Sequence, residues 1–263
     1  MGKSRSMGVM VAIPSSGRNV PIGWALAMAS LSYPVGMNHA LFCNVANPEN
    51  KEMTRDKQRE SLAERAIALG AEFIMWIDDD TIPPAHAVQS LWYVLSQNPN
   101  AAICGGIYCS KEANPSPLVF KELGAGPFWH WTLGDIFPVA GVATGCMLVR
   151  TSVFKTLPKP WFKDFSVAEP GRTELVGEIE LPIAGDQGTD DLYFCRKVGE
   201  AGHVILAHGG VLPVHVGEDG KQYVLAEDSY PYVSYLHKKA EFEAKGQDPR
   251  NREQKISVAE VKS

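Results

Sequence analysis

The first 110 residues alternate between short apolar runs and longer stretches with helical character, and this order restricts the fold more than any other feature. The expected strands are Gly8–Ile13, Ala40–Val45, Phe73–Ile77 and Ala102–Tyr108. The expected helices between them are Ile22–Leu31, Glu52–Leu69 and Pro84–Ser96. Strands that alternate with helices form a mainly parallel sheet with helices on both faces. We therefore expect an α/β fold.

The stretch Glu52–Leu69 has the clearest helical pattern of the chain. Its apolar side is formed by Leu62, Ala63, Ala66, Ile67 and Leu69. The charged residues assigned to the rest of its surface are Lys57, Arg59, Glu60, Glu64 and Arg65. Gly70 follows as a stop signal, because glycine tolerates the left-handed backbone that ends many helices.

The second half of the chain has a different character. Residues 115–135 combine proline, glycine and aromatic residues without a clear period, and Phe137–Arg150 holds short apolar runs broken by glycine. Trp161–Ala184 is irregular, which is typical of a long loop or a short hairpin. Thr189–Ala201 predicts a helix, and Val204–Val216 predicts short strand segments. From His237 onward the polar sequence predicts a solvated helix followed by disorder.

Composition excludes several functional classes. The formal net charge of −5 gives no basic footprint for coating DNA or RNA. No stretch approaches the ~20 apolar residues that a membrane span requires, and residues 1–6 are too polar for a signal peptide. The five cysteines are an odd number without a CxxC pair, which is typical of reduced thiols. We therefore expect a cytoplasmic protein without a membrane span.

Three consecutive carboxylates, Asp78, Asp79 and Asp80, follow the expected strand Phe73–Ile77 directly. In α/β sheets, ligands bind beyond the carboxyl ends of the strands. Adjacent carboxylates repel one another unless water or a cation intervenes, and their hard oxygen atoms suit Mg²⁺ or Mn²⁺. The cluster therefore predicts a metal site. The alternative is a solvated acidic turn in which Asp80 or Thr81 caps the next helix.

Two later motifs carry chemistry only in combination with this cluster. Asp190 and Asp191 open the expected helix Thr189–Ala201, where acidic residues also complement the helix dipole. His215 lies in an apolar stretch that ends at Gly217. Taken alone, each motif has a structural explanation, namely helix capping for the aspartates and a core position for the histidine.

In this order, the motifs resemble the GT-A glycosyltransferases, particularly their family 2-like members. The resemblance runs from about Val9 to Gly217, and its order is more specific than any single motif. Its parts are Ile13–Ser16, the DxD-type Trp76–Asp80, Gly105–Tyr108, Thr144–Arg150, Thr189–Asp191 and His215. It implies a Rossmann-like GT-A domain over residues 1–240, with a nucleotide-sugar half at about 8–110, a smaller mixed acceptor half at about 111–217, and a polar tail at 241–263.

The resemblance also implies roles for individual residues around the donor. The implied ligands of a Mn²⁺ or Mg²⁺ ion that bridges the donor diphosphate are Asp78, Asp80 and His215. The implied contacts to the nucleotide-sugar are Pro14, Ser15, Ser16, Arg18, Asp78 and Asp79. The donor would be a UDP- or GDP-sugar.

On the acceptor side, Asp191 matches the catalytic base of the family. Asp190 occupies a position where the family usually has Glu, so either aspartate can be the base. The acceptor is open between a glycan, a small molecule, a protein and a modified nucleobase. A cation would neutralise the departing nucleoside diphosphate, and the base would take the acceptor proton in an inverting reaction. A retaining enzyme would use the cation without such a base.

Three other readings remain open at this point. Asp78-x-Asp80 with Gly185–Asp190 also resembles a haloacid-dehalogenase-type phosphatase, although that family places its DxD after the first strand. A nucleotidyltransferase would use the same carboxylates with Mg²⁺, and a binding module would have lost catalysis. The aromatic residues that either stack on sugars or fill the core are Phe128, Trp129, Trp131 and Trp161.

Overall fold

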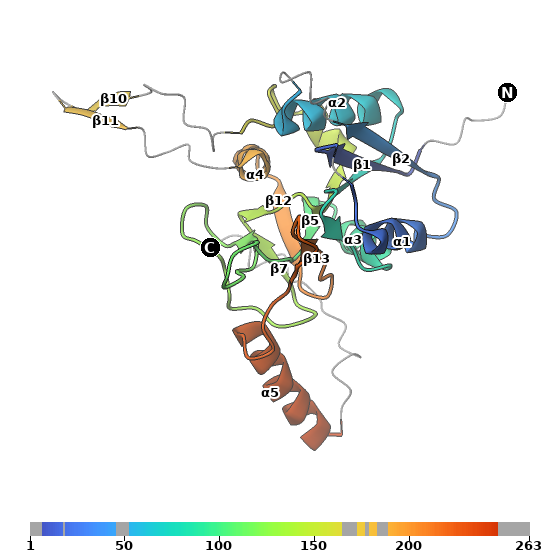
Figure 1. Cartoon of the computed structure of the whole chain (residues 1–263), viewed down its shortest axis with the longest axis vertical. Coiled ribbons are helices and arrows are strands. Elements are labelled where there is room, and N and C mark those ends of the chain that lie inside the picture. Colours follow the sequence, from blue (N-terminus) through green and yellow to red (C-terminus); the bar gives the residue numbers. More distant parts are fainter. Residues whose placement is uncertain are drawn as a thin grey trace.

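The computed structural model describes residues 7–17, 19–45, 53–164 and 189–246, together with the backbone of 173–176 and 179–182. Its centre is a seven-stranded sheet with the order β2-β1-β3-β9-β5-β12-β7 (Figure 1). These strands are β1 (Val9–Ser15), β2 (His39–Val45), β3 (Phe73–Ile77), β5 (Ala101–Gly106), β7 (Ile136–Val139), β9 (Cys146–Arg150) and β12 (Val204–His208). The four strands expected in the first 110 residues are all present in this sheet.

Five of these strands run in the same direction, whereas β9 and β7 run opposite to their neighbours. β9 pairs with β3 on one side and with β5 on the other, and Cys146 lies opposite Ile77. The short apolar runs of Phe137–Arg150 gave no indication that one of them would enter the centre of the sheet. Because β9 is antiparallel, its first residues lie beside the last residues of β3, where the acidic cluster begins.

Helices cover both faces of the sheet, as the alternation predicted. They are α1 (Ile22–Ser30), α2 (Arg55–Ala68), α3 (Ala87–Gln97) and α4 (Asp190–Glu200). Successive side chains of a strand point to opposite faces. Trp76 of β3 therefore joins a core cluster with residues of α2 and α4, and its neighbour Ile77 joins a second cluster with residues of α3. The α/β fold class, with a mostly parallel sheet, is confirmed.

A second, three-stranded sheet explains how a late segment reaches the acidic cluster. Its strands are β4 (Thr81–Ile82), β13 (Val214–Val216) and β14 (Gln222–Tyr223). β13 runs antiparallel to β4, and His215 pairs with Thr81. The backbone of Val216 also donates a hydrogen bond to the carbonyl oxygen of Asp80 at 2.8 Å. This pairing places His215 beside Asp80, the last of the three aspartates.

The remaining elements are short or lie at the periphery. β6 (Val119–Phe120) pairs with β8 (Gly141–Val142), and a 3-10 helix, η1 (Thr151–Lys155), follows β9. β10 (Thr173–Val176) and β11 (Ile179–Pro182) form an antiparallel hairpin. This hairpin is one of the two structures that the sequence predicted for Trp161–Ala184.

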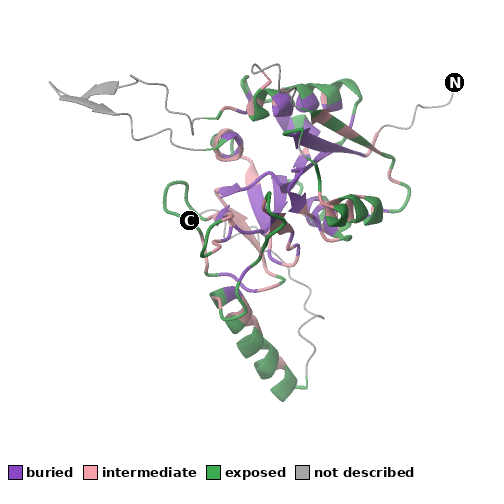
Figure 2. Ribbon diagram, in the orientation of Figure 1, coloured by how far each residue is buried: buried purple, intermediate pink, exposed green. Residues whose placement is uncertain are grey.

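The last described helix, α5 (Tyr230–Ala244), extends away from the sheet and is mostly exposed (Figures 1 and 2). The predicted solvated helix is therefore present, but it begins before His237. Pro231 lies in its first turn, where the fixed φ of proline favours a helix start. α5 also runs through position 240, the expected end of the domain. Among the described residues, no helix has both the length and the apolar character needed to cross a membrane.

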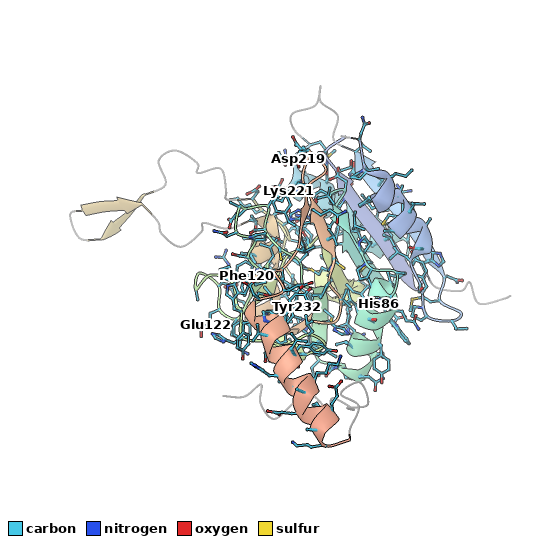
Figure 3. The ribbon with its side chains drawn as sticks, turned by 60° about the horizontal axis from the view of Figure 1, so that its bottom comes forward. His86, Phe120, Glu122, Asp219, Lys221 and Tyr232 are labelled. Carbon is cyan, nitrogen blue, oxygen red and sulfur yellow. The ribbon has the colours of Figure 1, made fainter. Side chains whose placement is uncertain are left out.

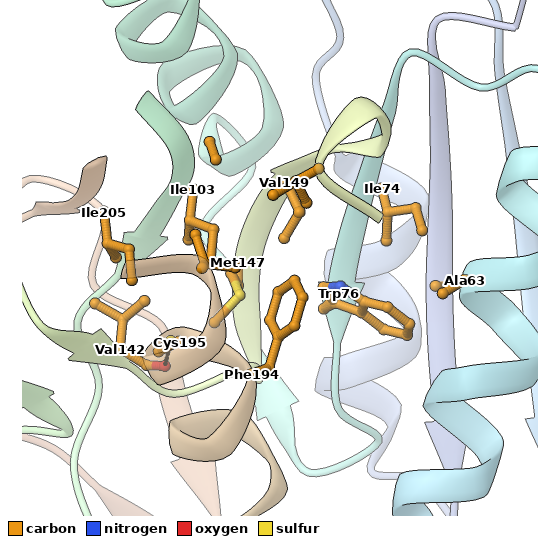
Figure 4. Packing of buried hydrophobic residues seen from close by; sticks show 14 of the residues in the cluster. Ala63, Ile74, Trp76, Ile103, Val142, Met147, Val149, Phe194, Cys195 and Ile205 are labelled. Atoms are coloured by element: carbon orange, nitrogen blue, oxygen red, sulfur yellow. Dashed lines mark hydrogen bonds between the residues drawn. The ribbon is translucent and has the colours of Figure 1, made fainter. Parts of the chain in front are cut away.

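The position of α4 depends on Phe194, which is fully buried and reaches toward the sheet between Met147 and Trp76 (Figure 4). Its ring stacks on Phe154 and packs against Phe162, with ring centres 5.2 and 4.6 Å away. We expect Phe194→Ala to lower the free energy of unfolding by ~3–5 kcal/mol, because it leaves a cavity under the helix. Urea titration measures this loss.

The matched control is Tyr93→Ala, which removes an aromatic ring that is 61% exposed on α3. This change should alter stability by no more than ~0.5 kcal/mol. Similar losses in the two variants would show that Phe194 does not anchor α4.

Candidate functional site

The aspartates that follow β3 are buried rather than solvated. Asp78, Asp79 and Asp80 expose 6%, 1% and 8% of their surface. The next helix, α3, has His86 at its N-cap position, so neither Asp80 nor Thr81 caps it. The alternative of a solvated, capping acidic turn is therefore wrong. Burying three adjacent carboxylates costs free energy unless each one has hydrogen-bonding or charged partners. Each of the three aspartates has a different set of such partners.

Asp79 fixes the loop that follows β1. Its Oδ2 atom accepts hydrogen bonds from Ser15 Oγ at 2.9 Å, from the Ser16 backbone N at 2.9 Å and from Ser16 Oγ at 3.1 Å. The predicted nucleotide residues Ser15, Ser16 and Asp79 are thus brought together, and Pro14 lies beside them at the end of β1. Arg18, the other predicted residue of this loop, lies outside the described residues.

Asp78 and Asp190 share a buried arginine that the sequence analysis missed. Arg59 of α2 is 1% exposed, and its Nη2 atom lies 2.9 and 3.2 Å from the two carboxylate oxygens of Asp78. Its Nη1 atom donates to Asp190 Oδ2. Burial alone would lower the pKa of Arg59, but the nearby carboxylates of Asp78, Asp190 and Asp191 outweigh burial and raise this pKa above its ordinary value. One guanidinium therefore joins the end of β3 to the start of α4.

The helical period offered a signal for this residue. Arg59 precedes the apolar positions Leu62, Ala63 and Ala66 by three, four and seven residues, which places it on their side of the helix. Its charge alone predicts a place on the solvated surface of the helix. A charged residue in line with an apolar stripe indicates a buried ion pair.

Asp80 faces His215 and Lys111. Lys111 Nζ lies 2.6 Å from Asp80 Oδ2, and His215 Nε2 lies 3.5 Å from Asp80 Oδ1. Burial alone would raise the pKa of Asp80, but it is outweighed by His215, when its ring carries both protons and donates to Asp80, and by the hydrogen bond with Lys111, which together hold this pKa below its ordinary value. His215 lies in β13, and the turn that follows this strand contains Asp219 and Lys221, which are labelled in Figure 3.

The orientation of His215 suits a metal ligand. Its Nδ1 atom lies 2.8 Å from the carbonyl oxygen of Cys109. A carbonyl can only accept a hydrogen bond, so Nδ1 carries the proton, and in the neutral ring Nε2 presents a lone pair to Asp80. Two acceptors then face each other at 3.5 Å, an arrangement that a shared cation or a second ring proton stabilises.

The carboxylate of Asp80 and the imidazole of His215 could hold one divalent cation between them. Two ligands ~2.1 Å from an octahedral ion and at right angles lie ~3.0 Å apart, close to the observed separation. Of the three predicted ligands, Asp80 and His215 are together, while Asp78 is directed at Arg59. In the part of the chain that is described, no group of three His, Cys, Asp or Glu side chains is arranged to hold a metal. Mg²⁺ is commonly bound by one or two carboxylates together with substrate phosphates.

The aspartates at the start of α4 differ in their surroundings. Asp190 is 4% exposed and is held by Arg59. Asp191 is partly exposed and accepts hydrogen bonds from Thr189 Oγ1 and, at 2.8 Å, from the Leu192 backbone N. Burial, together with the charge of Asp190, raises the pKa of Asp191 above its ordinary value. The two adjacent carboxylates therefore occupy different electrostatic environments.

Gly145, directly before β9, allows the side chains of Tyr108 and Thr81 to pack closely at this edge of the sheet. Its backbone N donates to Tyr108 Oη at 2.9 Å. A Cβ atom at this position would lie 2.4 Å from Tyr108 Oη and 2.6 Å from Thr81 Oγ1. Only glycine leaves room for this approach, which gives the Thr144–Arg150 motif a structural role beside the aspartates.

The aromatic residues of the second half belong mainly to the core. Trp131 and Trp161 are 2% and 5% exposed, and their indole N atoms donate to the carbonyl oxygens of Phe128 and Leu157. Phe128 and Trp129 are partly buried against the same core cluster. Trp131 and Trp161 are therefore not exposed platforms for sugar stacking.

No protein-family model matches this chain, and no curated protein matches it. Solved structures do resemble it. One is described as "Crystal Structure of A197 from STIV", with a TM-score of 0.56, 13% identity, and coverage of 85% of this chain and 96% of that chain. Another is "Crystal structure of GalNAc-T7 with UDP, GalNAc and Mn2+", with a TM-score of 0.51 and 11% identity. That alignment covers 89% of this chain but 48% of GalNAc-T7, so the chain spans about half of its length.

At these identities the likeness shows the fold alone. The mixed α/β architecture, with its seven-stranded and mostly parallel sheet, is a GT-A-like, Rossmann-type fold. The predicted fold is thereby confirmed, and the acidic cluster lies at the carboxyl end of β3 within it.

The buried Arg59 gives a direct test of this site. Arg59→Met keeps much of the side-chain volume but leaves Asp78 and Asp190 buried without their shared cation. Removing one partner of a buried ion pair costs ~3–5 kcal/mol, and we expect a loss of unfolding free energy of this size in urea titrations.

Arg65→Met on the same helix is the control. Arg65 is exposed, and its guanidinium lies 4.3 Å from the centre of the Phe42 ring. Its loss should cost no more than ~1 kcal/mol. A stable Arg59→Met variant would show that the three charges do not depend on one another.

Proposed function

We propose that this chain is a metal-dependent glycosyltransferase, related to the family 2-like GT-A enzymes, that moves a sugar from a UDP- or GDP-sugar to an acceptor hydroxyl. The observation that carries this proposal is the placement of His215 Nε2 3.5 Å from Asp80 Oδ1 at the carboxyl end of β3. The GT-A-like fold supports it, as does a structural neighbour described with UDP, GalNAc and Mn²⁺.

Asp80 and His215 would hold the cation, and donor phosphates would complete its coordination. When bound, Mn²⁺ or Mg²⁺ supplies Lewis-acid stabilisation of the departing nucleoside diphosphate. Asp78 keeps Arg59 in place, and its oxygens retain lone pairs that can accept a hydrogen bond from a ribose hydroxyl. Asp79 holds the Pro14–Ser16 loop against the same edge of the sheet, which favours one shared site for nucleotide and cation.

We assign the base to Asp191 rather than Asp190. Asp190 is bound to Arg59 in a buried ion pair, so its carboxylate is committed to holding the fold. Asp191 is partly exposed, and its raised pKa lies closer to the neutral pH at which a general base must accept a proton. An acceptor hydroxyl beside Asp191 would lose its proton to this carboxylate as the bond to the sugar forms.

The function is tested by release of nucleoside diphosphate from UDP- and GDP-sugars when Mn²⁺ is added. Nucleotide binding, followed by thermal shift and calorimetry, should require the cation and should be lost in Asp80→Asn. This substitution removes a charge at nearly constant shape, so the fold should persist.

Asp228→Asn, an exposed acidic position before α5, is the control and should bind as the parent does. If Asp80→Asn binds nucleotide as tightly as the parent with Mn²⁺ present, the cation assignment is wrong. Release of inorganic phosphate from phosphomonoesters, without cleavage of nucleotide sugars, would identify a phosphatase instead.

A separate prediction concerns the base. Asp191→Asn should leave Mn²⁺ and nucleotide binding near normal and should slow transfer, or donor hydrolysis by water, by ~10²–10⁴. Because the base acts only when ionised, the rate of the parent should fall as pH drops through the pKa of Asp191, at a pH above the ordinary aspartate value.

The Asp190→Asn variant distinguishes the roles of Asp190 and Asp191. This variant should lose stability through Arg59 and keep much of its turnover below its lowered melting temperature. The opposite result, with Asp190→Asn inactive and Asp191→Asn active, would exchange their roles. If neither variant slows the reaction, a mechanism without a base at this position is the better account.

A further inference from the structure

Lys111 pairs with Asp80, the residue on which the proposed cation site depends, but the proposed function gives it no task. It lies on the loop between β5 and β6, where Glu112, Ala113 and Asn114 are exposed. Its side chain is 27% exposed and points inward, with Nζ 2.6 Å from Asp80 Oδ2. The loop is closed at its base by a hydrogen bond from the Ser110 backbone N to the Ser116 carbonyl oxygen at 2.8 Å.

The charges at this edge are divided between two cations. Arg59 is fully buried and pairs with Asp78 and Asp190. Lys111 pairs with Asp80 and, unlike Arg59, reaches the site from an exposed loop on a long and flexible side chain. Asp80 is therefore neutralised by a group that can leave without unfolding the core.

A divalent cation at Oδ1 of Asp80 and the ammonium of Lys111 at Oδ2 would share one carboxylate, and like charges at such short range repel each other. Each positive charge therefore weakens the binding of the other, and this repulsion favours the departure of Lys111 from Asp80 when the cation binds. The expelled ammonium needs a new anionic partner, and the diphosphate of a nucleotide sugar at the same site provides one.

We propose that Lys111 is the resident counter-charge of the cation site and couples cation binding to binding of the donor diphosphate. This inference rests on the proposed glycosyltransferase function. Lys111 holds Asp80 in the empty site and weakens binding of the cation alone. It then transfers to the phosphates when cation and nucleotide bind together. The two ligands consequently bind with positive cooperativity, and each strengthens the other by the same factor.

The test measures Mn²⁺ binding rather than turnover. Free Mn²⁺ is followed by electron paramagnetic resonance during titration of the parent and of Lys111→Gln, first without nucleotide and then with UDP or GDP. Chelation of Mn²⁺ by the nucleotide itself is measured without protein and subtracted. Without nucleotide, Lys111→Gln should bind Mn²⁺ more tightly than the parent, by a factor in the ~5–150-fold range typical of coupling between sites. The strengthening of Mn²⁺ binding by nucleotide should shrink by a similar factor.

Two further variants make the result specific. Lys111→Arg keeps the positive charge and should bind Mn²⁺ alone as weakly as the parent. Lys121→Gln removes an exposed lysine ten positions later, whose Nζ donates to the Pro138 carbonyl oxygen, and should leave Mn²⁺ binding unchanged. Melting temperatures verify that each variant is folded.

The outcomes separate this inference from the function on which it rests. If the parent binds Mn²⁺ with nucleotide but Lys111→Gln gains no affinity for Mn²⁺ alone, the role of Lys111 is refuted and the function stands. Equal gains in Lys111→Gln and Lys111→Arg would also refute competition between charges. If the parent binds no Mn²⁺ with or without nucleotide, the cation-dependent function itself fails, and the role of Lys111 fails with it.

Discussion

The pairing of Arg59 with Asp78 and Asp190 is the constraint on which the rest of this edge depends. It joins helix α2 and the end of β3 to the start of α4, which lies 131 positions after Arg59 in the chain. A buried guanidinium between two carboxylates fixes direction as well as distance, because its planar donors match carboxylate oxygens. This ion pair also fixes the position of Asp191, because Asp191 is the next residue on α4.

Antiparallel pairing completes the site that the parallel strands begin. In a sheet of parallel strands alone, the carboxyl end of β3 would meet only the ends of its neighbours. Insertion of β9 brings Gly145 to Asp78, whose backbone N lies 3.4 Å from the Gly145 carbonyl oxygen. The pairing of β13 with β4 brings His215 to Asp80. A GT-A-like sheet thus gathers residues from both halves of the chain.

Four of the carboxylates at this edge are stabilised by three different means. Asp78 and Asp190 share a buried guanidinium, Asp79 accepts hydrogen bonds from two serines, and Asp80 pairs with a partly exposed lysine. The first arrangement is anchored by helices α2 and α4, and the second by Ser15 at the end of β1. Lys111, by contrast, reaches Asp80 from an exposed loop on a flexible side chain, which favours exchange with a ligand at this carboxylate.

The sequence by itself determined the strand–helix alternation of the first half and the acidic cluster after β3, because hydrophobic periodicity and residue order are local properties. It could not determine that β9 enters the sheet, since pairing between distant strands leaves no local signal. It assigned Arg59 by residue type, whereas burial depends on carboxylates 19 and 131 positions away. It also left Trp131 and Trp161 open between sugar contact and core, which packing alone decided. The tertiary structure decided these cases, because contacts between residues distant in the chain determine which groups are buried and which partners they meet.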